Sequence, residues 1–214
     1  MMALGWLALY LLTADEFSVR EVIVSGNETI SAEDIYRLSG LKETNIFFVR
    51  PAQMEAAIAQ IPNIKGARVS CRLPDQVIIE VEERQVEIVW QVGDTLYSVD
   101  AEGAVFLTTG GTDQALLIRD LDGHHLRPGE HIDSGLVEAA HKLRSLLPEV
   151  KALDYSRPEG LSFTDERGWR VLLGTGEDLE YKIAVLRALF QEIERKGIKV
   201  ELIDLRFKGS VYYR

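Results

Sequence analysis

Residues 61–84 read IPNIKGARVSCRLPDQVIIEVEER, and they carry the clearest structural pattern in the N-terminal part of the chain. Its two extended runs, 64–73 and 76–84, are separated by Pro74-Asp75, a pair that favours a tight turn. In the second run apolar residues alternate with glutamates, which is typical of a strand with one solvated face. The stretch therefore predicts an antiparallel hairpin whose second strand keeps its acidic residues outward.

A strand and two short helices are predicted upstream of this hairpin. Residues 17–25 (FSVREVIVS) have the β-branched composition of a strand, and Gly26-Asn27 follows as a turn. A capping-box pattern then opens a helix over 32–39. A second helix is expected over 51–60, where Pro51 fits the first turn. The resulting order of elements is β-α-α-β-β.

From Gln85 onward the pattern changes to short strands joined by tight turns, so we place a domain boundary near Arg84. Amphipathic helices interrupt these strands. The expected strands are 87–92, 95–99, 104–107, 115–119, 151–156, 160–164, 169–173, 199–207 and 210–213, and the expected helices are 135–147 and 177–196. The sequence predicts an α+β fold, in which a β-α-α-β-β domain precedes a larger mixed sheet with flanking helices.

The composition excludes several classes of protein. The chain has 214 residues, of which 46% are hydrophobic and 27% charged, a globular mixture rather than that of a disordered tail, collagen or a polytopic membrane protein. Its net charge of −10 argues against a nucleic-acid partner, because phosphate binding needs clustered Lys and Arg. The single cysteine, Cys71, excludes an intramolecular disulfide framework and a cysteine-based zinc site.

Residues 1–14 (MMALGWLALYLLTA) carry no charge and are almost entirely apolar. As a helix they would extend about 21 Å, whereas a bilayer core is about 30 Å thick. No basic residue precedes the apolar run, although a secretory signal would need one. Three interpretations stay open from these residues alone: a buried core helix, a trimmed signal, or the outer part of a transmembrane helix.

The sequence contains no pattern typical of catalysis or of metal binding. Residues 174–176 (GTG) precede a helix, but they lack the lysine of a phosphate-binding loop, and the acidic residues that follow would repel an anion. The histidines His124, His125, His131 and His141 do not have the spacing of metal ligands. We therefore expect no enzymatic activity, no cofactor and no metal.

The C-terminal segment is dense in aromatic residues and arginine. Its two runs, 203–207 (IDLRF) and 211–214 (VYYR), predict a terminal hairpin, and Tyr and Arg are enriched at interface hot spots. One interpretation is a hairpin that simply completes the sheet. The other is a sheet edge whose unpaired backbone groups accept a strand from a partner.

Four stretches resemble, in order and spacing, the FtsQ/DivIB family of bacterial cell-division proteins. They are residues 17–41, residues 61–90, residues 97–106 (YSVDAEGAVF), and the combination of 169–174, Tyr181-Lys182 and 203–207. The resemblance implies a POTRA domain over 17–84 and an FtsQ-type β domain over 85–214. It also implies that residues 1–14 are an incomplete transmembrane or membrane-proximal segment.

The resemblance implies a non-enzymatic scaffold of the division machinery, the divisome. Such a protein crosses the cell membrane once, at the division septum, with most of its chain outside the cytoplasm. Its POTRA domain would contact other divisome components, and its second domain would bind FtsB/DivIC-like and FtsL-like proteins by strand addition at the C-terminal sheet edge. Carried over to this sequence, the partner-binding residues are Arg206, Phe207, Gly209, Ser210, Val211, Tyr212 and Tyr213.

An alternative function is that of a POTRA-type chaperone or docking module in an outer-membrane transport system. That function would call for tandem POTRA copies, and the sequence contains one match to the POTRA pattern.

Overall fold

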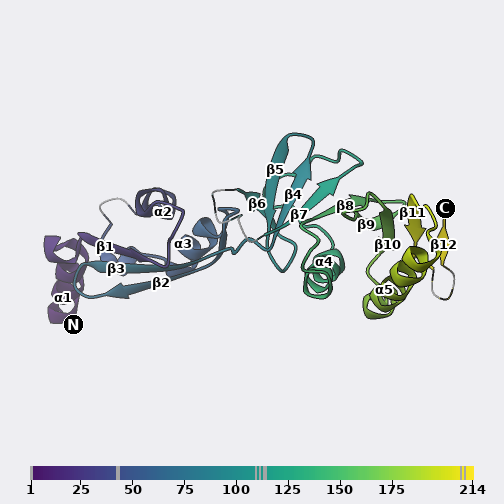
Figure 1. Cartoon of the computed structure of the whole chain (residues 1–214). Coiled ribbons are helices and arrows are strands. Elements are labelled where there is room, and N and C mark those ends of the chain that lie inside the picture. Colours follow the sequence, from purple (N-terminus) through teal and green to yellow (C-terminus); the bar gives the residue numbers. More distant parts are fainter. Residues whose placement is uncertain are drawn as a thin grey trace. The chain divides into compact units, whose positions relative to one another are not determined.

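The computed structural model describes residues 2–41, 44–108, 110, 112, 115–207, 209 and 211–214. The chain divides into two compact units, Met1–Arg84 and Gln85–Arg214 (Figure 1). Each unit has its own cluster of buried apolar side chains, as expected of separately packed domains.

The described residues of the N-terminal unit form a three-stranded sheet with the strand order β1-β3-β2. β1 runs parallel to β3, and β2 pairs with β3 as the predicted antiparallel hairpin. The elements are α1 (Met2–Thr13), η1 (Asp15–Phe17), β1 (Glu21–Ser25), α2 (Ala32–Ser39), η2 (Ile46–Phe48), α3 (Pro51–Ile58), β2 (Ile64–Arg72) and β3 (Gln76–Glu83), where η denotes a 3₁₀ turn. The predicted β-α-α-β-β order is confirmed.

Helices α2 and α3 pack against the sheet through a few fully buried residues. Ile35 and Ile58 from the helices meet Val77 and Ile79 from β3, and all four are 0% exposed. Glu80 and Glu82, on the other face of β3, are exposed as predicted. The prediction is wrong for Glu83, which shares the face of Val77 and Ile79 and is 8% exposed.

The loop between β1 and α2 is held to the end of β3 by the Glu83 carboxylate. This carboxylate accepts hydrogen bonds from the backbone N–H groups of Glu28, Thr29 and Ile30, at 2.9–3.1 Å, and from the Thr29 hydroxyl. Burial opposes ionisation of Glu83, but these hydrogen bonds outweigh it and lower the pKa of the carboxyl below the ordinary glutamate value. Gly26, at φ +81°, starts this loop, and a Cβ there would lie 2.0 Å from the Val81 carbonyl oxygen.

Replacing Glu83 with Gln is expected to destabilise the N-terminal unit by about 1.5–3 kcal/mol, because charge-assisted hydrogen bonds to three backbone donors are lost. The ionised Glu83 carboxylate stabilises the folded state at a pH above the pKa of glutamate in the unfolded chain, about 4.3. This stabilisation is lost as the pH falls through the lower pKa that Glu83 has in the folded state. Urea unfolding at pH 7 and pH 3 measures both effects. Glu82→Gln, on the exposed side of the same strand, is the control and should change stability by less than about 0.5 kcal/mol. Equal effects of the two substitutions would contradict this role of Glu83.

Helix α1 does not lie in a core. Trp6 is 75% exposed and Leu9 is 57% exposed, so the interpretation of residues 1–14 as a buried core helix is wrong. Within the part of the chain that the structure describes, no helix has the length and apolar character needed to cross a membrane.

The described residues of the C-terminal unit form a nine-stranded mixed sheet with the order β12-β11-β10-β9-β8-β7-β4-β5-β6. The elements are β4 (Ile88–Val92), β5 (Thr95–Val99), β6 (Val105–Leu107), β7 (Leu116–Asp120), α4 (Ser134–Leu146), β8 (Ala152–Ser156), β9 (Gly160–Thr164), β10 (Arg170–Gly174), α5 (Leu179–Lys196), β11 (Leu202–Asp204) and β12 (Tyr212–Tyr213). The pairs β4–β7, β7–β8 and β10–β11 are parallel, and the remaining pairs are antiparallel. The predicted mixed sheet with flanking helices is confirmed.

Helices α4 and α5 cover one face of this sheet (Figure 1). Their buried residues, such as Leu143 and Leu186, pack with Ile118, Leu153 and Val171 from the strands. α4 begins one residue earlier than predicted, because the Asp133 carboxylate accepts the hydrogen bond from the Gly135 N–H at 2.7 Å and caps the helix.

The two ends of the large sheet differ. At one end the outer side of β6 is covered by the loop before α4, since the Val105 N–H donates to the Glu130 carbonyl and the Val105 carbonyl accepts from the Gly129 N–H. At the other end β12 is the last strand, and its outer side pairs with no strand among the described residues. The C-terminal end of the sheet is therefore its open edge.

Candidate functional site

Strand β12 is joined to β11 by a short antiparallel ladder. Leu202 and Arg214 exchange both backbone hydrogen bonds, at 3.2 Å each, and Tyr213 lies opposite Ile203 in the next pair. Because hydrogen-bonded and non-bonded pairs alternate in such a ladder, the Tyr213 N–H and carbonyl point away from β11. The outer edge of β12 thus presents one donor and one acceptor at Tyr213.

The two tyrosines of β12 lie on opposite faces of the sheet. Tyr213 shares the register of Ile203, on the face that the helices cover, whereas Tyr212 is opposite Asp204 on the other face. Tyr212 ends a row that crosses the sheet through Asp204, Leu172, Ser162, Asp154 and Arg119. An added strand would therefore extend both faces of the sheet.

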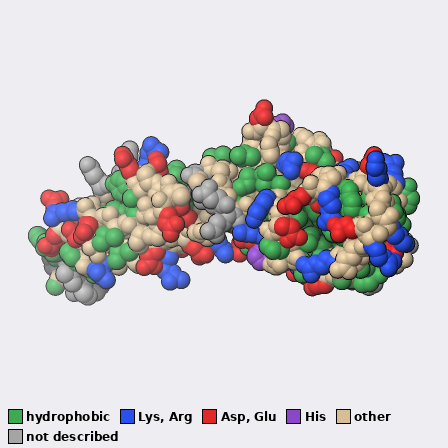
Figure 2. All heavy atoms as spheres, in the orientation of Figure 1, with side chains coloured by type: hydrophobic (Ala, Val, Ile, Leu, Met, Phe, Trp, Pro, Cys, Tyr) green, Lys and Arg blue, Asp and Glu red, His purple; other side chains and the backbone are tan. Residues whose placement is uncertain are grey.

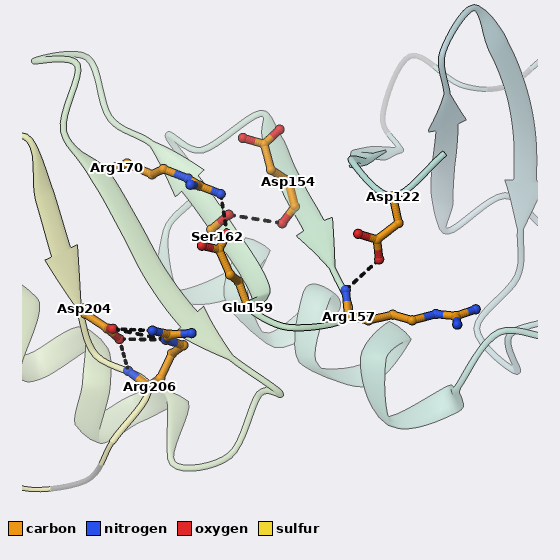
Figure 3. A network of polar contacts seen from close by, with 8 residues as sticks. All are labelled: Asp122, Asp154, Arg157, Glu159, Ser162, Arg170, Asp204 and Arg206. Carbon is orange, nitrogen blue, oxygen red and sulfur yellow. Dashed lines mark hydrogen bonds and ion pairs between the residues drawn. The ribbon is translucent and has the colours of Figure 1, made fainter. Parts of the chain in front are cut away.

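The predicted strand over 199–207 is too long, because the ordered strand β11 ends at Asp204. The Asp204 carboxylate accepts hydrogen bonds from the Arg206 backbone N–H at 3.0 Å and from Arg206 Nη2 at 2.6 Å (Figure 3). The Leu205 N–H still donates to the Leu172 carbonyl of β10 at 2.9 Å, and the local turn at Asp204–Arg206 follows the end of the strand. The hydrogen bonds from Arg206 also hold the pKa of Asp204 below its ordinary range.

Phe207 follows this turn and is 68% exposed. The Arg206 guanidinium carbon lies 5.6 Å from the centre of the Phe207 ring, within the range of a cation–π contact. The salt bridge to Asp204 fixes the Arg206 guanidinium, which contacts the exposed Phe207 ring just beyond the end of β11.

A buried lysine supports the same corner of the sheet. Lys182 on α5 is 5% exposed, and its Nζ donates a hydrogen bond to the Leu173 carbonyl at 2.7 Å. Burial lowers the pKa of Lys182, while the nearby carboxylates Glu177, Asp178 and Asp204 act in the opposite direction. The lysine thereby links α5 to the end of β10, the strand on which β11 pairs.

Gly174 at the end of β10 lies beside the Arg206 side chain. It has φ +81°, and a Cβ at this position would lie 3.4 Å from Arg206 Cγ. On the helix-free face Arg170 Nη2 contacts Glu159 Oε2 at 2.5 Å (Figure 3). Arg206 forms its salt bridge with Asp204, and the charge of Glu159 is close enough to act on Arg206 as well.

The structure brings together most of the residues expected to bind a partner. Phe207, Val211, Tyr212 and Tyr213 are all at least 41% exposed at the open edge, whereas Arg206 is half-buried. Gly209 adopts φ +77° between the two strands, and Ser210 lies outside the described residues. The sequence did not identify Asp204 and Lys182 as supporting residues of this site. The Asp-x-Arg spacing at the end of a strand could have indicated the turn that Asp204 forms with Arg206.

Basic and acidic side chains are interspersed over the visible face of each unit (Figure 2). Among the described residues, no group of three or more His, Cys, Asp or Glu side chains could hold a metal ion. The chemistry available at the open edge is backbone hydrogen bonding and aromatic contact.

Comparison with protein families assigns both units. Residues 17–84 match the family model described as the FtsQ-type POTRA domain, so the N-terminal unit contains a POTRA domain. Residues 88–206 match the model of the C-terminal region of cell division protein FtsQ/DivIB. The chain belongs to the FtsQ/DivIB family of cell-division proteins.

Related proteins support this assignment. A cell division protein FtsQ of Chloroflexus aurantiacus is 28% identical over 210 residues, covering 95% of this chain and 76% of the relative. The FtsQ protein of Chloroflexus aggregans is 30% identical over 213 residues, with the same coverage. The cell division protein DivIB of Clostridium acetobutylicum is 28% identical over 210 residues, covering 92% of this chain and 82% of the relative. These relatives support a role in cell division, and the family is not a known enzyme family.

Proposed function

We propose that this chain is a divisome scaffold that binds FtsB/DivIC-like and FtsL-like proteins by strand addition at β12. The carrying observation is the open sheet edge, where the Tyr213 backbone groups point outward next to exposed aromatic side chains. An extended segment pairing there would gain backbone hydrogen bonds from the edge and side-chain contacts from Phe207 and the tyrosines.

The remainder of the chain has complementary roles in this proposal. Residues 85–214 act as the partner-binding β domain, and residues 17–84 act as a POTRA domain that contacts other divisome components. The apolar helix α1 supports anchorage in the cell membrane, with the two units outside the cytoplasm at the septum. Its exposed Trp6 and Leu9 are apolar side chains that a lipid environment would cover.

Mixing the full chain with the extracytoplasmic part of an FtsB/DivIC-like protein tests the proposed function. Phe207→Ala combined with Tyr212→Ala is expected to lower the affinity at least about 10-fold, because each removed side chain is exposed and supports contact rather than folding. Leu96→Ala, an exposed apolar residue on β5, is the matched control and should bind normally. Unchanged binding by the double variant would reject the site, and failure of the unmodified chain to bind would reject the function.

A further inference from the structure

The end of α1 is fixed to a turn of the N-terminal unit that lies more than thirty residues further along the chain. Asn45 Nδ2 donates a hydrogen bond to the Leu11 carbonyl at 3.0 Å, across a separation of 34 residues. The Tyr10 and Phe17 rings lie 6.3 Å apart in an edge-on arrangement, and Phe17 is 5.3 Å from Phe47. Three aromatic rings therefore connect the last turns of α1 to the 3₁₀ turn η2.

The conformation of η2 is set by its own hydrogen bonds. The Asn45 side chain caps the turn by accepting from the Phe47 N–H at 3.0 Å, and the Thr44 carbonyl accepts from the Val19 N–H at 3.0 Å. Although the turn is well anchored, Phe47 is 44% exposed and Phe48 is 57% exposed. Two adjacent phenylalanines are thus held outward instead of entering the core of the unit.

Phe47 joins the apolar side chains of α1, because its ring contacts Phe17 and Phe17 contacts Tyr10. Phe48 is the next exposed residue of η2 and lines a hollow with Leu41 and Met54. The first 14 residues carry no charge, and Trp6, Leu9 and Leu12 are exposed on the helix. A contiguous apolar surface of this kind marks a binding site for lipid or protein. Trp and Tyr are enriched at the boundary between lipid and water, and Phe and Leu are typical of the side chains that enter it from a segment lying at the surface.

Charged residues begin where this apolar surface ends. Asp15 and Glu16 follow α1 directly, and the Arg20 guanidinium donates to the Asp15 carbonyl at 3.0 Å. Arg50, two residues beyond Phe48, is also exposed. An apolar helix, an aromatic cluster and then charges of both signs match the order of hydrocarbon, interface and water in a bilayer.

We propose that Phe47 and Phe48 insert into the interface of a phospholipid bilayer beside α1. The N-terminal unit then lies directly on the membrane surface, in a tilt set by the contacts between η2 and α1, rather than hanging from a flexible tether. This inference rests on the proposed anchorage of α1 and adds a second, independent point of lipid contact.

The test uses the full chain reconstituted in vesicles of phosphatidylethanolamine and phosphatidylglycerol. In a Cys71→Ser background, single cysteines introduced by Trp6→Cys, Phe48→Cys or Gln60→Cys carry an environment-sensitive fluorophore. Lipids with a nitroxide near the top of the acyl chain then quench fluorophores that lie in the interface. Gln60 is the control because it is exposed at the other end of the sheet. It lies three residues before Asn63, whose carbonyl accepts a hydrogen bond from the Arg84 N–H after the end of β3. The turn η2 instead lies at the start of β1, where Asn45 forms a bridge with Ser18.

Quenching at positions 6 and 48 is expected to exceed that at position 60 several-fold. Quenching at position 6 with position 48 no different from position 60 would overturn the inference and leave the anchorage intact. No quenching at either position 6 or position 48 would reject both. Quenching at position 48 alone would contradict the anchorage of α1 and, with it, the inference that η2 inserts beside an anchored helix.

Discussion

Tyr213→Pro is expected to weaken partner binding at least about 100-fold, or about 2.8 kcal/mol, without unfolding the C-terminal unit. The Tyr213 N–H faces the open side of β12, so proline removes the donor that an added strand would use and leaves the bonds to β11 in place. Proline is tolerated on an edge strand when its missing N–H would have faced solvent. Titration of the full chain with the FtsB/DivIC-like segment measures the effect.

Two further variants separate the backbone from the side chain. Tyr213→Ala keeps the outward N–H and should bind much better than Tyr213→Pro. Tyr212→Pro removes an N–H that faces β11 and should instead loosen β12, which far-ultraviolet circular dichroism and unfolding would detect. Equal affinities of Tyr213→Ala and Tyr213→Pro would show that the partner does not pair with this edge.

Gly160→Ala is expected to destabilise the C-terminal unit by about 3 kcal/mol. Gly160 has φ +70°, and a Cβ there would lie 2.3 Å from the Gly174 carbonyl carbon and 2.4 Å from its oxygen. The β9–β10 pair has an irregular register at this point, so the two backbones approach more closely than side chains allow. Because both neighbouring atoms are backbone, the strands themselves must move apart.

Gly168→Ala is the matched control for this effect. Gly168 has a similar φ of +86°, but a Cβ there meets nothing within 4 Å, so only the backbone strain of about 1 kcal/mol is expected. Urea unfolding followed by the fluorescence of Trp90 and Trp169 reports on this unit. If the two alanine variants lost the same stability, the close approach at Gly160 would not be limiting.

The local elements of the N-terminal unit are predictable because their signals lie close together in the sequence. The turn residues Pro74-Asp75 separate two runs that do form β2 and β3, and Ser31 does cap α2 by accepting from the Asp34 N–H. Helical spacing is less reliable for side-chain burial. It places both Ile35 and Leu38 on the inner face of α2, yet Leu38 is 48% exposed because this short helix buries only a narrow stripe.

Pairing between distant strands is not predictable from local patterns. The parallel neighbours β4 and β7 are separated along the chain by β5 and β6, and β10 and β11 are separated by α5, so no pattern within either segment shows that the two strands meet. At the open edge, the density of aromatic residues and arginine in the sequence pointed to Phe207, Tyr212 and Tyr213 as contact residues. The hydrogen bonds between Asp204 and Arg206, which end β11 and position Phe207, depend on geometry that the residue types alone do not specify.

The most direct test of strand addition is the hydrogen-exchange rate of the Tyr213 backbone amide, measured with and without a saturating FtsB/DivIC-like segment. Strand addition should slow exchange at Tyr213 at least about 10-fold, since its outward N–H would become hydrogen-bonded. The Tyr212 amide, which already faces β11, serves as the internal reference. Saturated binding with an unchanged exchange rate at Tyr213 would contradict pairing at β12.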